Sequence, residues 1–577
     1  MSRSPRWSLP ALLAAAAIVF SACAGAASPS PSASSGASTG PSGSAASSAP
    51  FTGMSYPESG EAPCGTAPYT GSMKKITATA RNTVEFQLCA PDPAFLPKVA
   101  FSVFGIFDSD FLAAHAKDKS YLTAPVGTGP YKVKEWSKGN RLVYEINNDY
   151  WGTKALTPGL EFRWSDEAAQ RLLELNSGTV DGIDNPGADD INTIKGKAEQ
   201  AFYVRDPLNT FFIGFNSTLK PWSNEKIRKA IALGINRKQI VDNFYPAGSE
   251  VADYFTPCNV PLGCEGEKTW DFDLAQAKTL LAEGLKEEGL TSIKTKLQFR
   301  AAVRGYLPDP PQIATEISQQ LKTNLGIETT LDLQESGAYL DANAAGKLEG
   351  IFLLGWGADY PDPTNFLDYH FGAGSGKKFG KPFDDIAVAL QKGATSLDEA
   401  ARKAAYVEAN NLIKQHLPMV IVAHGASGTA FKKDVTGAHS SPLSNEVFSV
   451  MKAADRPSIV WLQNAEPLSL YCGDETDGES LRACEQVNEA LYAYEVGGTK
   501  AVPHLATECK PNTDASTWIC TLRDGVKFSD GADFDANDVV VSYAAQWDTK
   551  HPLHIGRSGA FEYWPGLWNG FLNPPTP

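Results

Sequence analysis

The chain is poor in the residue patterns that metal and redox sites need. Its 577 residues include 8 scattered histidines and 9 cysteines, and no two cysteines form a C-x2-C pair. Structural zinc sites combine Cys and His at short, fixed spacings, which this sequence does not have. The sequence therefore predicts neither a metal site nor a cofactor.

The chain also lacks an excess of basic residues and the common catalytic motifs. It has 51 Lys and Arg against 66 Asp and Glu, a net charge of -15, which argues against nucleic-acid binding. Residues 372–378 are similar to a phosphate-binding loop, but Phe371 takes the first glycine position and no Ser or Thr follows the lysines. No Gly-x-Ser-x-Gly elbow is present. An exported enzyme is therefore disfavoured.

The N-terminus lacks an apolar run long enough to cross a bilayer. The apolar run at residues 9–20 falls short of the roughly 20 residues that a spanning helix needs. Arg3 and Arg6 precede it, and Ser21-Ala-Cys23 follows it, which resembles a bacterial lipobox although Phe20 stands where Leu is usual. The resemblance implies that residues 1–23 are a lipoprotein signal peptide and that Cys23 carries the lipid anchor. A plain secretory signal with an incidental cysteine is the alternative.

Residues 24–50 have almost no large apolar residue and no charge, so they predict a flexible Ser/Ala/Pro linker. Eight cysteines follow, and an even number in an exported chain suggests disulfides. Eight cysteines allow 105 connectivities, and proximity in the sequence favours one of them. The favoured pairs are Cys64 with Cys89, Cys258 with Cys264, Cys472 with Cys484, and Cys509 with Cys520.

The length predicts two or three domains, and the hydrophobic periodicity predicts an α/β fold with mixed sheets. Short alternating or apolar runs indicate strands, and amphipathic runs indicate helices. The expected strands are 83–88, 131–136, 141–146, 180–183, 211–216, 327–331, 350–354 and 419–423. The expected helices are 165–175, 223–244 with a break at 234–237, 273–281, 311–325, and one that a capping box at 396–399 opens and that ends near His416.

The stretch 355–371 directly follows the apolar strand at 350–354. Pro361 and Pro363 argue against a helix at this point, so the strand is expected to end in a sharp turn. The turn presents Trp356 and Asp359, and an aromatic wall beside a carboxylate suits an amine or a polar organic ligand. A surface turn with solvated aspartates is the alternative that composition alone allows.

Taken together, many short segments resemble the family-5 extracellular solute-binding proteins of ABC importers, the oligopeptide- and dipeptide-binding group. The resemblance spans nearly all of residues 70–577. The matching segments are 126–131 with Trp136, 148–152, 177–178 with Asp181, 215–216 before Pro221, 227–231, 273–281, 355–366 and 416–418.

The order of the segments differs from that of the family. Segments similar to the family's usual beginning, at 459–463, 503–506, 518–531 and 538–543, come last here, and each appears once. This order indicates a circular permutation, which chains tolerate when the new ends lie in an exposed loop. The implied division is domain II at 51–122 and 505–577, domain I at 123–255 and 440–504, and domain III at 256–439.

The resemblance implies a periplasmic-binding-protein-like fold: two lobes with mixed sheets, joined by a hinge, plus a small extra domain. Ligand would lie between the lobes, which close over it and then dock on a permease. Asp359 matches the family's aspartate that pairs with a peptide's α-amino group, because a buried ammonium needs a carboxylate. Trp356 and Gly357 would bind the peptide backbone as an added strand. Tyr360 and Asn365 are rim candidates, while Gly127, Gly129 and Tyr131 are assigned to scaffold.

The sequence thus predicts a monomeric, lipid-anchored receptor of an ABC importer on the extracytoplasmic face of the membrane or in the periplasm. Its partners would be a peptide and ABC permease subunits. The same fold carrying an oligosaccharide or another small organic solute is an alternative, since the chain has 12 tryptophans. A sensory binding module with no importer is a further alternative. No residue can be placed as the partner of a ligand carboxylate.

Overall fold

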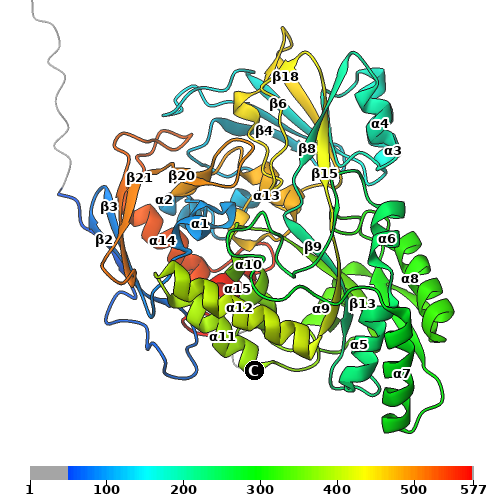
Figure 1. Cartoon of the computed structure of the whole chain (residues 1–577). Helices are drawn as coiled ribbons and strands as arrows, with labels where there is room; N and C mark the ends of the chain where they lie inside the picture. The colour runs from blue at the N-terminus through cyan, green and yellow to red at the C-terminus, as the bar shows by residue number, and fades with distance from the viewer. Residues whose placement is uncertain (1–49, 374, 575–577) are drawn as a thin grey trace, which may run out of the picture. The chain divides into compact units, whose positions relative to one another are not determined.

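The computed structural model describes residues 50–373 and 375–574, and the described residues from 51 onward form one compact unit (Figure 1). The signal peptide, Cys23 and most of the linker that the sequence predicts lie outside the described residues. Among the described residues, no helix combines the length and the apolar character needed to cross a membrane.

A seven-stranded mixed sheet forms the first lobe, at the top of Figure 1. Strand β18 lies at its centre, parallel to both β6 and β7, although it comes about 300 residues after β6 in the chain. The order is β4 (Tyr131–Ser137), β5 (Arg141–Ile146), β6 (Gly159–Trp164), β18 (Ser458–Gln463), β7 (Gly182–Asp184), β15 (Ser427–Lys432) and β8 (Gln200–Arg205). Helices α3 (Ala168–Ser177) and α4 (Asp190–Lys195) contact β7 and β8.

A six-stranded mixed sheet forms the second lobe. Its order is β10 (Glu250–Val251), β14 (Met419–His424), β9 (Asn209–Phe215), β13 (Ile351–Gly357), β11 (Lys294–Arg300) and β12 (Glu328–Gln334). Phe211 and Ile213 of β9 pack into one hydrophobic cluster, and Phe212 between them packs into another. Because side chains alternate between faces, an apolar run such as β9 or β13 fills the cores on both sides of the sheet.

Helices cover both faces of this sheet. Helices α5 (Glu225–Gly234), α6 (Arg237–Phe244), α7 (Leu274–Glu288) and α8 (Pro310–Leu325) supply the first cluster, at the lower right of Figure 1. Helices α9 (Ser336–Ala344), α10 (Pro363–Phe371), α11 (Asp384–Thr395) and α12 (Glu399–His416) supply the second.

The two ends of the described chain build a third sheet together. Its order is β1 (Ser55–Tyr56), β2 (Met73–Ala80), β3 (Thr83–Leu88), β22 (Thr517–Leu522) and β21 (Ala506–Pro511), and Figure 1 shows the blue and orange strands side by side. Strand β3 pairs antiparallel with β22, with Phe86 opposite Trp518. Helix α14 (Ala536–Trp547) packs on β1, β2 and β3.

The chain passes between the two large sheets twice. Residues 206–208 lead from β8 to β9, and residues 425–426 lead from β14 back to β15. The sheets therefore divide the chain near 207 and 425, whereas the predicted limits of domain III lay at 256 and 439. Segment resemblance could not locate these points, because β-pairing partners and not local patterns decide which sheet a strand joins.

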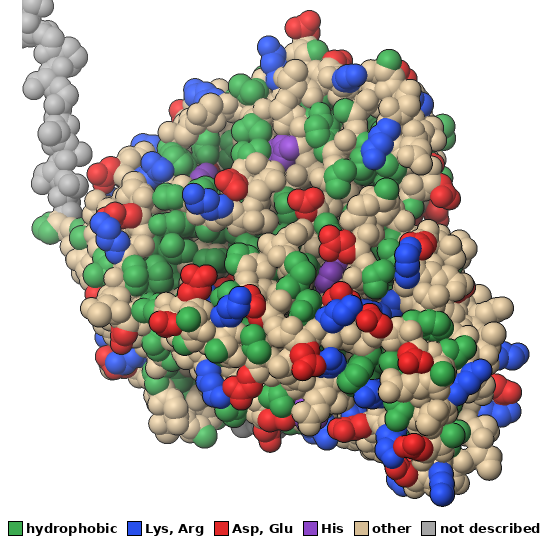
Figure 2. Space-filling view, in the orientation of Figure 1, with side chains coloured by type: hydrophobic (Ala, Val, Ile, Leu, Met, Phe, Trp, Pro, Cys, Tyr) green, Lys and Arg blue, Asp and Glu red, His purple; other side chains and the backbone are tan. Residues whose placement is uncertain are grey.

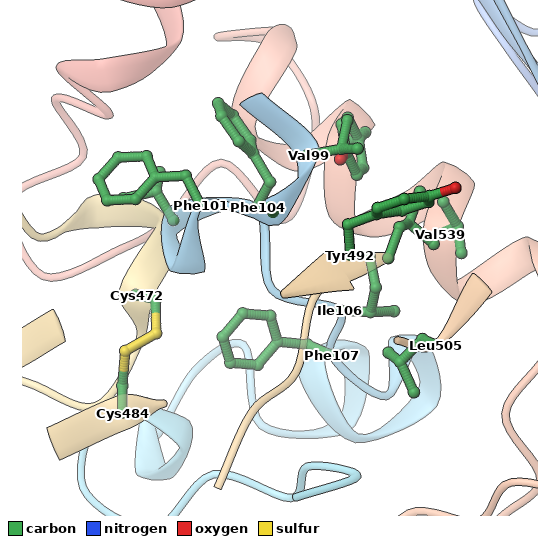
Figure 3. Packing of buried hydrophobic residues seen from close by; sticks show 14 of the residues in the cluster. Val99, Phe101, Phe104, Ile106, Phe107, Cys472, Cys484, Tyr492, Leu505 and Val539 are labelled. Atoms are coloured by element: carbon green, nitrogen blue, oxygen red, sulfur yellow. A yellow bond between two sulfur atoms is a disulfide. The ribbon is translucent and has the colours of Figure 1, made fainter. Parts of the chain in front are cut away.

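All four disulfides predicted from proximity are confirmed: Cys64–Cys89, Cys258–Cys264, Cys472–Cys484 and Cys509–Cys520. Cys509 and Cys520 are opposite each other in the β21–β22 pair. Figure 3 shows Cys472–Cys484 beside the apolar side chains of Phe101, Phe104 and Phe107, so this bond crosslinks the wall of a buried cluster.

Most of the expected helices and strands are confirmed to within a few residues. Strands 83–88 and 141–146 match β3 and β5, and the predicted break at 234–237 separates α5 from α6. The predicted cap of α12 is wrong by two residues. Asp398, and not Ser396, is its N-cap, and the Asp398 carboxylate accepts from the Ala401 N–H, because that oxygen reaches the third residue of the first turn.

Candidate functional site

The segment after β13 leaves the six-stranded sheet and enters helix α10 within six residues. The prediction that Pro361 and Pro363 exclude a helix here is wrong for Pro363, which is the first residue of α10. A proline at the first helical position costs no hydrogen bond and already has a helical φ. Asp362 caps the helix by accepting from the Thr364 N–H, and it pairs with Arg402 at 2.9 Å.

The Asp359 side chain is partly buried and held by two donors. Its Oδ1 accepts from the Tyr563 hydroxyl at 2.7 Å, and its Oδ2 accepts from the Asn365 amide at 2.8 Å. The Asn365 Oδ1 in turn accepts from the Asp359 N–H at 3.0 Å. Burial raises the pKa of Asp359 to about 6, although both hydrogen bonds lower it.

Three parts of the chain that are far apart in sequence meet at Asp359. Asp359 follows β13, Tyr563 begins α15 (Tyr563–Trp568), and Tyr494 ends β19 (Tyr492–Tyr494). The Tyr494 hydroxyl donates to the Pro97 carbonyl at 2.7 Å and lies 3.5 Å from the Asp359 carbonyl. Asp359 therefore lies where the second lobe contacts the C-terminal segment and β19.

The loop before α15 is anchored by acidic side chains near the first-lobe disulfide Cys472–Cys484. The Asp474 carboxylate accepts from the backbone N–H groups of Ser558, Gly559 and Phe561. Glu475, next to it, pairs with Arg557 at 2.7 Å. Because these bonds fix the loop two residues before α15, they set the position from which Tyr563 reaches Asp359.

The Asp359 carboxylate has hydrogen-bond donors but no cation. Within residues 50–373 and 375–574, no Lys, Arg or His lies within ion-pair distance of it, and its side-chain partners are Asn365 and Tyr563. Partial burial makes a carboxylate harder to ionise when no positive partner is near. The site therefore suits a ligand that brings a cation, such as an ammonium group.

Trp356 and Gly357 lie beside this carboxylate. Trp356 is partly exposed and stacks on Tyr369 with ring centroids 3.9 Å apart. The Lys378 ammonium lies 4.1 Å from the centroid of the Tyr369 ring. Gly357 is exposed, and a Cβ there would meet open space. There is therefore free space beside Gly357 for the ligand backbone that the sequence predicts there. The Trp356 ring is held in place by its stacking on Tyr369.

The structure corrects the roles predicted for Tyr360 and Asn365. Tyr360 is 1% exposed and its hydroxyl contacts Thr364, so it belongs to the core and not to a rim. Asn365 is fully buried and acts by holding Asp359. Both positions result from the first turn of α10, which packs against residues 359–360: Thr364 contacts Tyr360, and Asn365 contacts Asp359.

The scaffold assignment of the 126–131 turn agrees with its packing. A Cβ at Gly127 would lie 2.2 Å from the Val487 carbonyl oxygen, and one at Gly129 would lie 2.6 Å from the same atom. Tyr131 is fully buried, with its hydroxyl donating to the Thr157 carbonyl. These glycines are needed because the backbone of residue 487 passes directly against them.

Tyr563 and Tyr494 are the site residues that sequence reasoning missed. Each is more than 130 residues from Asp359, and no local pattern marks either. Arg304, to which the sequence assigns no role, is partly buried. Burial lowers the pKa of Arg304, but Glu479, Tyr306 and Asp477 together outweigh this effect and raise it. Glu479 lies in α13 (Gly478–Cys484) of the first lobe, and Asp477 directly precedes that helix.

A small pocket in the second lobe is lined by Asp253, Phe255, Asn410 and their neighbours, and it includes none of the predicted ligand residues. Within the described residues, no group of three or more His, Cys, Asp or Glu could hold a metal ion. The face shown in Figure 2 carries acidic and basic side chains intermixed.

Comparisons with known proteins identify relatives over most of the chain. The family profile described as "Bacterial extracellular solute-binding proteins, family 5 Middle" matches residues 15–378 and 500–559. The "Dipeptide-binding protein" of Escherichia coli (strain K12) is 26% identical over 409 residues, covering 69% of this chain and 72% of that protein. The "Probable ABC transporter periplasmic-binding protein SapA" of the same strain is 25% identical, covering 66% of this chain and 70% of that protein.

A solved structure of a periplasmic binding protein also matches this chain. The periplasmic binding protein DppA from Helicobacter pylori, in complex with the peptide STSA, superposes with a TM-score of 0.57 at 25% identity, covering 64% of this chain and 72% of that chain.

Proposed function

Because the chain belongs to the family-5 bacterial extracellular solute-binding proteins, we propose that it binds peptides with a free N-terminus and that Asp359 receives their α-amino group. Family membership makes it a solute-binding protein of the ABC-transporter type and not an enzyme. The observation that carries the proposal is the partly buried Asp359 carboxylate, which has two donors and no cation among the described residues. A peptide ammonium supplies the missing charge.

The proposed binding mode uses the residues next to Asp359. Gly357 leaves room for a ligand backbone to approach the end of β13, where it could add main-chain hydrogen bonds as a strand does. Trp356, stacked on Tyr369, offers an apolar wall beside it. Relatives named for dipeptide binding, and one solved with the peptide STSA, support a peptide as the ligand.

We further propose the cellular setting. The family name places its members outside the cell, which agrees with residues 1–23 as a lipoprotein signal peptide, Cys23 as a lipid anchor and residues 24–50 as a tether. The ligand-loaded receptor, as a monomer, would deliver peptide to ABC permease subunits. Release of the soluble protein after Cys23→Ser, with the native chain retained in the membrane fraction, tests the anchor.

A circular permutation remains part of the proposal, together with the three-domain division. The third sheet combines strands from both ends of the described chain, and β18 joins the middle of the first lobe's sheet from late in the sequence. Both arrangements support a segment order rotated relative to the family. In this division domain II is built from the two ends of the chain, domain I holds most strands of the seven-stranded sheet and domain III most strands of the six-stranded sheet.

Native mass spectrometry of the purified, never-denatured protein tests the peptide proposal. We expect adduct masses that fragment as peptides, because closure of two lobes slows ligand release. A hexose series, or a protein whose melting temperature rises with oligosaccharides and not with peptides, would contradict it and assign the tryptophans to the ligand instead.

The raised pKa of Asp359 predicts a pH dependence of binding. The free site is protonated below about 6, whereas the ammonium complex requires the carboxylate, so affinity is lost as pH falls through 6. Below that value each pH unit costs about tenfold in affinity. Calorimetry in buffers of different ionisation enthalpy checks this, since binding near pH 5.5 should release a proton from the native protein. Binding that releases no proton at that pH would contradict it.

A further inference from the structure

The two crossovers between the lobes are joined by one side chain, that of Asn209. Its amide Nδ2 donates to the Gly425 carbonyl at 2.7 Å, and its Oδ1 accepts from the Gly425 N–H at 2.9 Å. The His424 ring donates from Nδ1 to the Asn209 carbonyl at 2.7 Å. Residue 209 directly follows the first crossover, and residue 425 begins the second.

These bonds begin where main-chain pairing between β9 and β14 stops. The last register pair is Phe211 with Ala423, and beyond it the Asn209 amide takes the place of a backbone peptide group, since it offers one donor side and one acceptor. Gly425 is required for this approach, because a Cβ there would lie 2.1 Å from the Gly305 carbonyl oxygen. The segment at 305 is thus pressed against the same junction.

The same residue also contacts the candidate ligand loop. Asn209 is opposite Gly357 in the β9–β13 pair. The next loop residue, Ala358, donates its N–H to the carbonyl of the crossover residue Leu208 at 2.8 Å. Asp359 is therefore one residue away from a direct backbone bond to the first crossover.

On the first-lobe side the crossovers start from fixed points. Arg205, the last residue of β8, is buried and pairs with Asp184 at 3.0 Å and with Glu446 at 2.6 Å. Ser427, the first residue of β15, is opposite Arg205 in the sheet. Rotation between the lobes is consequently confined to residues 206–208 and 425–426, and Asn209 lies at the second-lobe end of both.

We propose that Asn209 is a positioning residue that couples the Asp359 loop to the hinge, so that ligand contact at the loop and rotation at both crossovers are linked through its amide. The proposal rests on the ligand role of Asp359 and adds the route by which occupancy reaches the hinge. A ligand that orders residues 357–359 orders Leu208 and Asn209 through β13–β9 pairing, and Asn209 passes this order to Gly425.

Hydrogen–deuterium exchange of the unliganded full-length protein tests the coupling without a known ligand. Asn209→Ala should accelerate exchange at least fivefold in two separate segments, 356–360 and 424–428, and increase the radius of gyration in small-angle scattering. Asn410→Ala is the matched control, because Asn410 is a buried second-lobe amide that donates to the Glu265 carbonyl away from the hinge. It should leave both segments and the radius unchanged.

Asn209→Asp retains the acceptor for the Gly425 N–H and loses the donor, so it should give an intermediate effect and serves if the alanine variant folds poorly. Acceleration in 424–428 alone, or in neither segment, would overturn the coupling. The proposed function has a separate readout. Trialanine added in excess should protect 356–360 and 424–428 together in the native protein and only 356–360 in Asn209→Ala. Protection of neither segment in the native protein counts against peptide binding, while the unliganded comparison still decides the role of Asn209.

Discussion

Asp359→Ala is expected to weaken binding of a peptide with a free N-terminus by about 100- to 1,000-fold, or about 3–4 kcal/mol. The loss is large because the variant leaves a ligand ammonium enclosed without a carboxylate, and an unpaired buried charge is costly. The same variant should change the affinity for the N-acetylated form of that peptide by less than about threefold, since no charge pair is lost. Isothermal titration calorimetry with the paired peptides measures both.

Two controls separate this effect from damage to the fold. Asp359→Ala removes the acceptor of Tyr563 and Asn365, so thermal unfolding must show that the variant remains folded. Asp384→Ala removes an exposed carboxylate at the start of α11 in the same lobe and should leave both affinities unchanged. Equal losses for the free and acetylated peptides would show that Asp359 does not bind the amine.

Glu446→Gln is expected to lower the free energy of unfolding by about 3–5 kcal/mol. Glu446 bridges Arg205 at 2.6 Å and Arg482 at 2.7 Å, and Asp184 pairs with both arginines at 3.0 Å. All four side chains are buried, with two positive and two negative charges. Burial alone would raise the pKa of Glu446, but Arg205 and Arg482 outweigh it and hold the pKa at about 2. Neutralising Glu446 leaves two buried arginines that share the single carboxylate of Asp184.

Denaturant unfolding with the disulfides intact measures this loss. Lys238→Ala is the control, because Lys238 and Asp242 form an exposed pair four residues apart on α6, and such a pair contributes less than about 0.5 kcal/mol. A loss below about 1 kcal/mol for Glu446→Gln would show that water or relaxation compensates the four-residue cluster. The variant should also speed hydrogen–deuterium exchange at residues 206–208. Glu446 holds Arg205, and Arg205 is the last residue of β8, directly before this crossover.

Local patterns predicted much of the secondary structure. The alternation in 83–88 and 141–146 matched β3 and β5, because one face of each strand packs on a core and the pattern is written within six residues. The disulfides were also predictable, since each pair lies within 25 residues. The helix start at Pro363 was missed because proline is excluded from a helix interior but favoured in the first turn. The local sequence alone does not distinguish these two positions.

The candidate site was only half predictable. Asp359, Trp356 and Gly357 lie in one stretch after an apolar strand, so sequence reasoning could single them out. Tyr563 and Tyr494 are brought to Asp359 by the packing of α15 and β19, which no local signal encodes. The resemblance made Tyr360 a rim candidate, whereas the fold around α10 buries it.

The sequence by itself determined the family, the α/β class, most helices and strands, the disulfide pairs and the carboxylate proposed to bind the ligand, because each depends on residues close together in the chain or on a specific order of short segments. Only the tertiary structure decided which strands share a sheet, where the chain crosses between lobes, which hydroxyls hold Asp359, and that Asn209 joins both crossovers. These features arise from contacts over hundreds of residues, and such contacts are set by the mutual packing of surfaces that no single segment contains.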